Sequence, residues 1–199
     1  MSMSPSQSPI VVASLPLTIA KAMKPILPKE GSLAQILCEP GPDLGRERTA
    51  RYVCTNGHVL LVVDTNLPAP TEAQLFSNER FRDTDTGRWL PTAVALVVSS
   101  QGHYKPEYFR ARDAGTFPDY AQVIPCGEGK AVDRIGFDVA YVGMMHKIHT
   151  ALKLGERTHW AVTFHGQLGP TTIIWEPMDP CADSSVTRLQ FIIMPVRLG

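Results

Sequence analysis

The spacing of apolar positions divides the chain into two halves, and each half opens with a predicted helix. In the first half, apolar side chains recur every three to four residues, as on the buried face of a helix. These positions are Ile19, Ala22, Met23 and Ile26. Ser14 can cap this helix, and Pro16 fits its first turn, where a missing N–H costs little. Pro25 and Pro28 end or kink the helix, so it is predicted to be short.

Residues 51–64 predict a β-hairpin. Two runs rich in β-branched and apolar residues flank Asn56 and Gly57, the pair that best accommodates the positive φ angles of a tight turn. The other elements predicted in this half are a strand over 33–39, a long loop or insertion over 65–91, and strands over 93–99 and 104–112.

The second half repeats the order of one helix followed by strands. Asp138 is predicted to cap a helix that ends near Gly155. Its inward stripe follows a 3.6-residue period and consists of Val139, Val142, Met145, Ile148 and Leu152. Strands are then predicted over about 159–165, 171–176 and 189–194. This repeated order predicts an α+β fold of two pseudo-symmetric modules, with strands pairing across the halves and both helices on one face of the sheet.

The length and composition fit one domain without disulfides. The chain has 199 residues, of which 44% are apolar, and this is enough to bury a substantial core. We expect a disordered tail over 1–9 and a single domain over 10–199, with a first module to about 116, a linker over 117–133 and a second module from about 134. The apolar run 10–20 has no basic residue before it and is interrupted by proline, so neither a signal peptide nor a membrane span is expected. A cytoplasmic protein is expected, and its four cysteines form no C-x-x-C pair.

The charges are distributed unevenly although they balance overall, with 19 basic and 19 acidic residues. Neither predicted helix carries an acidic residue. Their basic and histidine side chains include Lys21, Lys24, His146, Lys147, His149 and Lys153. Two such helices on one face of a sheet would form a positive strip that attracts phosphate without reading bases. The alternative is that these side chains are ordinary solvated helix faces.

Four segments, in their chain order, resemble the bacterial DNA polymerase III beta subunit, the sliding-clamp family. The first is CTNGHVLLVV (54–63), which is similar to the family's Thr-Asp-Gly-His-x-Leu hairpin, with Asn56 in place of the usual Asp. The second is FPDYAQVIP (117–125), which resembles a linker that closes a domain. The third is RIGFDVAYVGMMHKIHTAL (134–152), which resembles the strand and helix of the last domain. The fourth is LQFIIMPVRLG (189–199), which resembles the closing strand and its Met-Pro-x-Arg-Leu tail.

The resemblance implies a DNA-clamp-like fold and two binding surfaces. In the family, polymerase and other partners dock a short peptide in a pocket. The matching positions here are Thr55, Gly57, His58, Leu60, Pro125, Met194, Pro195, Val196 and Arg197. The family's helices face duplex DNA, which implies that role for the six helix side chains named above. Family members have three domains per chain and close a ring from two chains. This chain has room for two modules only, so a ring would need a homo-oligomer of several copies, a size that suits a phage or plasmid protein.

Enzymatic functions are weakly supported by the sequence. His146 and His149 are three residues apart and could present two metal ligands on one helix face, but no carboxylate joins them and no H-E-x-x-H pattern occurs. The sequence has no P-loop, no G-x-S-x-G motif and no dinucleotide fingerprint. We therefore expect no enzyme activity, metal or cofactor. The remaining alternatives are a clamp-derived binding module that recruits or competes for clamp-binding peptides without encircling DNA and, more remotely, an uncharacterised hydrolase.

Overall fold

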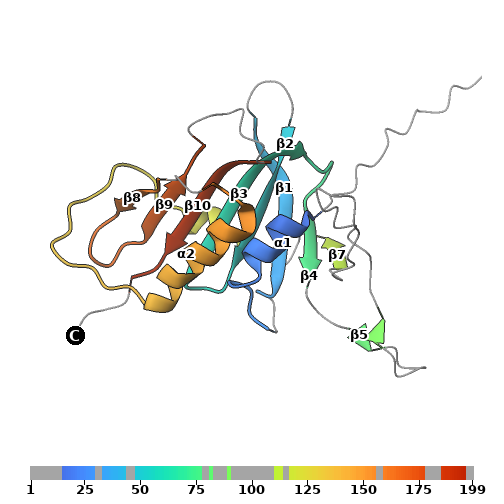
Figure 1. Ribbon diagram of the computed structural model, residues 1–199, viewed down its shortest axis with the longest axis horizontal. Helices are drawn as coiled ribbons and strands as arrows, with labels where there is room; N and C mark the ends of the chain where they lie inside the picture. Colours follow the sequence, from blue (N-terminus) through green and yellow to red (C-terminus); the bar gives the residue numbers. More distant parts are fainter. Residues whose placement is uncertain are drawn as a thin grey trace, which may run out of the picture.

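The protein is built on one large antiparallel sheet with two helices on one of its faces, as the computed structural model shows (Figure 1). The structure describes residues 15–29, 33–43, 48–77, 81–82, 89–90, 110–113, 117–155, 159–177 and 185–195. The helices are α1 (Leu17–Met23) and α2 (Val139–Leu152), with a short 3-10 helix, η2 (Tyr120–Val123). The strands of the large sheet are β1 (Gln35–Asp43), β2 (Arg48–Thr55), β3 (Val59–Pro68), β4 (Gln74–Ser77), β7 (Arg110–Asp113), β8 (Ala161–Phe164), β9 (Thr171–Trp175) and β10 (Val186–Ile193). A separate pair is formed by β5 (Phe81–Arg82) and β6 (Trp89–Leu90).

The eight strands of the large sheet lie in the order β7-β4-β1-β2-β3-β10-β9-β8. The two halves of the chain meet where β3 pairs antiparallel with β10, from Val59 opposite Ile193 to Thr65 opposite Val186. Every residue of β3 from Val59 to Thr65 is buried, because this strand is covered on both faces. The predicted pairing across the halves, the α+β class and the shared helix face are confirmed.

Both helices pack on the same face and contact each other (Figure 1). The predicted apolar positions of α1 are all buried, and they contact a core that also contains Tyr52, Leu61 and Phe191 from the sheet. α1 is short, as predicted. Its N-cap is Pro16, without a capping side chain, and Ser14 lies outside the described residues.

The inward stripe predicted for α2 is wrong at its N-terminal end. Ile148 and Leu152 are buried, but the exposed fraction is 81% for Val139 and 48% for Val142. Tyr141 and Met144 pack against the core in their place, beside the predicted Met145. The helical period was predicted correctly, but the face of α2 that contacts the sheet is rotated toward Tyr141 and Met144. These side chains are longer than valine and reach the sheet. Asp138 caps the helix as predicted, its Oδ1 accepting from the N–H of Ala140 at 2.8 Å.

The hairpin between β2 and β3 is confirmed, but its turn differs from the predicted type. Within this turn only Gly57 has a positive φ, of 88°, so Asn56 does not adopt the left-handed conformation. Its side chain instead stabilises the turn, because Oδ1 accepts from the N–H groups of His58 and Val59, both at 2.9 Å. Asparagine therefore serves as a hydrogen-bond acceptor here rather than as a left-handed residue.

The loop predicted over 65–91 is wrong in part. β3 continues to Pro68, and β4 adds a strand to the sheet beside β1. A mostly polar segment can form such a strand because two successive apolar residues of β4, Leu75 and Phe76, point to opposite faces of the sheet and are both buried. The strand predicted over 93–99 lies outside the described residues, and only the end of that predicted over 104–112 is described, in β7. The three strands predicted after α2 are confirmed as β8, β9 and β10.

In the part of the chain that the structure describes, neither helix is long and apolar enough to cross a membrane.

The rotation of α2 gives a direct test of the core. Ile148→Ala is expected to lower the free energy of unfolding by about 2–5 kcal/mol, because it leaves a cavity between helix and sheet. Val139→Ala in the same helix is the matched control and is expected to change it by no more than about 0.5 kcal/mol. Urea denaturation followed by circular dichroism measures both. Equal losses of stability in the two variants would contradict the described packing.

Candidate functional site

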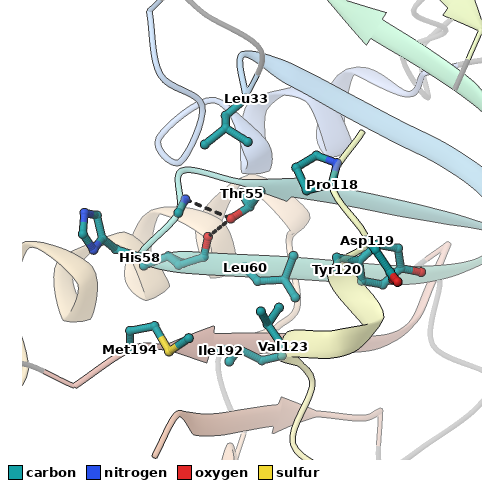
Figure 2. Close-up of a pocket in the computed structure, with 12 residues that line it drawn as sticks. Leu33, Thr55, His58, Leu60, Pro118, Asp119, Tyr120, Val123, Ile192 and Met194 are labelled. Atoms are coloured by element: carbon teal, nitrogen blue, oxygen red, sulfur yellow. Dashed lines mark hydrogen bonds between the residues drawn. The ribbon is translucent and has the colours of Figure 1, made fainter. Parts of the chain in front are cut away.

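A pocket of about 160 Å³ opens where three structural segments meet: the β2–β3 turn, the end of β10 and η2 (Figure 2). It lies on the side of the sheet opposite the helices, because Leu60 and Ile192 of its floor belong to the second apolar cluster, against which Tyr120 packs. Its lining comprises Leu33, Thr55, Gly57, His58, Val59, Leu60, Pro118, Asp119, Tyr120, Val123, Ile192 and Met194.

The turn side of the pocket is fixed by its own hydrogen bonds. The hydroxyl of Thr55 donates to the carbonyl of Val59 at 2.8 Å and accepts from the N–H of Gly57 at 3.1 Å (Figure 2). A side chain on Gly57 would be strained by its positive φ, although only Leu33 lies within 4 Å of the place a Cβ would take. The hydroxyl is thus engaged within the turn, while the glycine leaves the backbone open to an approaching chain.

The end of β10 completes the floor of the pocket. The N–H of Met194 donates to the carbonyl of His58 at 3.0 Å, which continues the β3–β10 ladder one step beyond the strand. Met194 is partly exposed, with an exposed fraction of 36%. The ring of His58 points away from Leu60 in Figure 2 and stacks on Tyr141 of α2, with ring centroids 6.3 Å apart. His58 therefore joins the pocket to the helix side of the sheet.

The third wall is η2, which lies over the helix-free face. Phe117, Tyr120 and Ile124 pack on the apolar cluster formed by β1, β2, β3, β4 and β10. The aromatic residues contact each other edge to face, with ring centroids 6.4 Å apart. The segment that resembles the clamp linker thus forms a wall of the pocket.

A polar network lies behind this wall. Arg51 and Asp64 pair across β2 and β3, with Nε–Oδ1 at 2.6 Å and Nη2–Oδ2 at 3.1 Å. The hydrogen bond that Arg51 donates to Asp64 raises the pKa of Arg51, so the guanidinium stays charged. The hydroxyl of Tyr120 donates to Glu39, and the Arg51 guanidinium lies near enough to act on the pKa of this hydroxyl. Burial is the main cause that raises the pKa of Tyr120 to about 12, with the Glu39 bond second.

The pocket can hold an apolar side chain. Its floor consists of aliphatic carbon and thioether surface, and the hydroxyls of Thr55 and Tyr120 are already hydrogen-bonded. Sites for drug-sized ligands measure roughly 300–1,000 Å³, so this volume suits one or two peptide side chains. Asp119 on the rim is exposed, and its carboxylate accepts from Gln122 at 2.9 Å.

The structure brings most of the predicted pocket residues together. Thr55, Gly57, His58, Leu60 and Met194 line one cavity. Pro125 and Pro195 do not line it, and Val196 and Arg197 lie outside the described residues. The segment 117–125 contributes residues that precede Pro125 instead, because the chain turns through η2 and places Pro125 away from the pocket. The prediction missed Leu33, Val59, Pro118, Asp119, Tyr120, Val123 and Ile192, several of which lie in the quoted motifs.

The predicted basic side chains lie on the two helices of the opposite face. Lys21, Lys24, His146, Lys147 and Lys153 are exposed. His149 is half-buried: its Nε2 lies 2.7 Å from the carbonyl oxygen of Gly155, and its ring lies beside Trp160. Lys153 takes the left-handed C-cap position, with φ 54°. No group of three or more potential metal ligands occurs among the described residues.

Solved structures similar to this chain include bacterial clamps. One is Caulobacter crescentus pol III beta, with 15% identity over 100% of this chain and 69% of that chain, at a TM-score of 0.48. A DNA polymerase sliding clamp from Caulobacter crescentus has 14% identity over 98% and 70% of the two chains, at 0.45. The DNA polymerase III beta chain from Streptococcus pneumoniae TIGR4 has 11% identity over 98% and 67%, at 0.41.

The solved structures that this chain matches are thus bacterial DNA polymerase III beta sliding clamps, of whose chains the match covers 67–70%. No protein-family model and no curated protein matches the sequence.

The raised pKa of Tyr120 predicts a pH dependence of stability. The folded pKa of about 12 lies above the ordinary value of 10.0, so the stabilising contribution is complete below pH 10 and is lost as the pH rises toward 12. The free energy of unfolding of the unaltered protein should therefore fall relative to that of Tyr120→Phe above pH 10. Urea denaturation of both proteins between pH 8 and pH 11.5 measures this, and a constant difference across that range would contradict it.

Proposed function

We propose that this chain is a sliding-clamp-like DNA replication accessory protein. It oligomerises around duplex DNA through copies of itself and tethers a polymerase or another partner, whose peptide inserts into the pocket between the β2–β3 turn, β10 and η2. It acts by binding and not by catalysis.

The observation that carries this proposal is the separation of two surfaces by one sheet. The exposed lysines of α1 and α2 lie on one face, and the apolar pocket lies on the other. A protein that holds DNA on one side and a partner on the other needs this arrangement, because a partner bound on the helix side would compete with the duplex. Lysines on adjacent helices attract phosphates of any sequence, as sliding requires.

Two segments far apart in the sequence meet at the pocket, and both support its assignment as a peptide site. The hairpin motif and the closing-strand motif, which resemble the family's peptide site, meet through the bond between Met194 and His58. Met194 offers adaptable thioether surface, and an extended peptide side chain fits beside Leu60 and Ile192.

Encirclement predicts topological retention on DNA. The protein should remain on closed circular plasmid during gel filtration and dissociate once the circle is cut at one site, because a ring slides off a free end. Light scattering should give a homo-oligomer at the same concentration. A monomer without retention would exclude the ring, and peptide binding by that monomer would point to the non-encircling binding module.

The helix face is tested separately by charge reversal. Lys21→Glu combined with Lys147→Glu should weaken binding to a linear duplex at low salt. The logarithm of the binding constant falls with the logarithm of the salt concentration, and the slope of this line should become less steep. The change should be about 0.9 for each phosphate that the protein no longer neutralises. Lys130→Glu combined with Arg134→Glu, at two exposed basic residues outside the helices and the pocket, is the matched control and should bind as the unaltered protein does. Fluorescence anisotropy measures all three proteins, and equally weakened binding in both variants would argue against a dedicated DNA face.

The pocket is tested with a fluorescein-labelled octapeptide that carries the clamp-binding motif of a bacterial replicative polymerase. Met194→Ala should weaken binding about tenfold, since it removes apolar surface from the floor, and His58→Ala should also weaken it. Leu168→Ala truncates another exposed apolar side chain, 67% exposed and away from the pocket, and should leave the affinity unchanged. Failure of the unaltered protein to bind the peptide would refute the pocket assignment.

A further inference from the structure

The wall of the pocket formed by η2 has little to hold it in place by itself. η2 contains only four residues, its N-cap Asp119 makes no side-chain cap, and none of its residues is fully buried. An isolated 3-10 turn of this length has poor hydrogen-bond geometry and little stability of its own. Its position over the sheet must therefore come from contacts that it makes with the strands.

Two kinds of contact connect η2 to the sheet. One is apolar packing of Phe117, Tyr120 and Ile124 on the second cluster, which is non-directional and permits sliding. The other is the hydroxyl of Tyr120, which donates to the carboxylate of Glu39 on β1 beside the Arg51 guanidinium on β2. Hydrogen bonds to charged groups are directional and comparatively strong. The hydroxyl is thus the contact that specifies where η2 stands.

The guanidinium beside this hydroxyl is itself fixed. Arg51 is held in two hydrogen bonds by Asp64, whose exposed fraction is only 5%. A guanidinium paired in this planar manner has little freedom to follow a moving partner. Glu39 projects from the neighbouring strand directly opposite Arg51, so the hydroxyl meets a carboxylate held beside a fixed guanidinium.

We propose that Tyr120 is a positioning residue that sets the width of the pocket, and thereby selects the size of the apolar side chain that a partner peptide inserts. Pro118 and Val123, which flank it, line the pocket together with Leu60 and Ile192 of the floor (Figure 2). A shift of η2 therefore changes the width directly. This inference rests on the proposed peptide-binding function and adds the determinant of its selectivity.

The test compares two forms of the octapeptide probe, one with leucine and one with tryptophan at the apolar anchor position. The unaltered protein should favour the leucine form by about tenfold or more, as expected for a pocket of fixed size. Tyr120→Phe should bind the leucine form about tenfold more weakly and bind the two forms almost equally, because the wall can now move outward.

Matched variants separate positioning from general destabilisation. Tyr52→Phe removes a hydroxyl from a buried tyrosine on the helix side of the sheet, so it should lower the melting temperature without changing peptide selectivity. Glu39→Gln keeps an acceptor for Tyr120 and should retain selectivity, whereas Glu39→Ala should behave as Tyr120→Phe does.

The outcomes distinguish this inference from the function on which it rests. If the unaltered protein binds neither peptide, the pocket function itself fails. If it binds the leucine form selectively and Tyr120→Phe keeps both the affinity and the selectivity, the pocket stands and the positioning role is overturned. Loss of selectivity in Tyr52→Phe as well would also overturn it, since selectivity would then follow stability alone.

Discussion

The antiparallel pairing of β3 with β10 is the contact on which the rest of this structure depends. It joins the two halves of the chain into one sheet, so that α1 from the first half and α2 from the second can cover the same face. The same ladder ends in the bond from Met194 to His58, which brings the end of β10 beside the β2–β3 turn. Without this pairing there would be neither a common helix face nor a floor for the pocket.

The centre of the sheet must satisfy two apolar faces at once. Along β3, Leu61 and Val63 contact the helix-side core, whereas Leu60 and Val62 belong to the cluster beneath η2. A strand in this position shows a continuous apolar run in place of alternation. The two faces of the sheet also differ in their surfaces. Exposed lysines lie on the helices, and a small apolar cavity lies on the helix-free side.

Polar groups on the helix-free face provide specificity that apolar packing cannot. Two hydrogen-bonded pairs lie there. Arg51 and Asp64 join β2 to β3, and Tyr120 joins η2 to Glu39 of β1. Removing one member of a buried ion pair leaves the other charge uncompensated, which costs more than the pair contributes relative to apolar residues. Such a network is therefore best understood as fixing one arrangement of the linker on the sheet, and the pocket inherits its shape from that arrangement.

The sequence alone determined the elements that depend on local chemistry. The hairpin around Gly57, the Asp138 cap, the buried positions of α1 and the three last strands could be predicted, because turn residues, capping side chains and apolar periodicity act over a few positions. Only the tertiary structure decided the rest. The rotation of α2 that exposes Val139, the entry of β4 into the sheet and the choice of Pro118 and Val123 over Pro125 as pocket walls depend on which distant surfaces lie opposite. A residue's own neighbours in sequence carry no information about that, since side-chain burial is set by shape complementarity between segments that the backbone brings together.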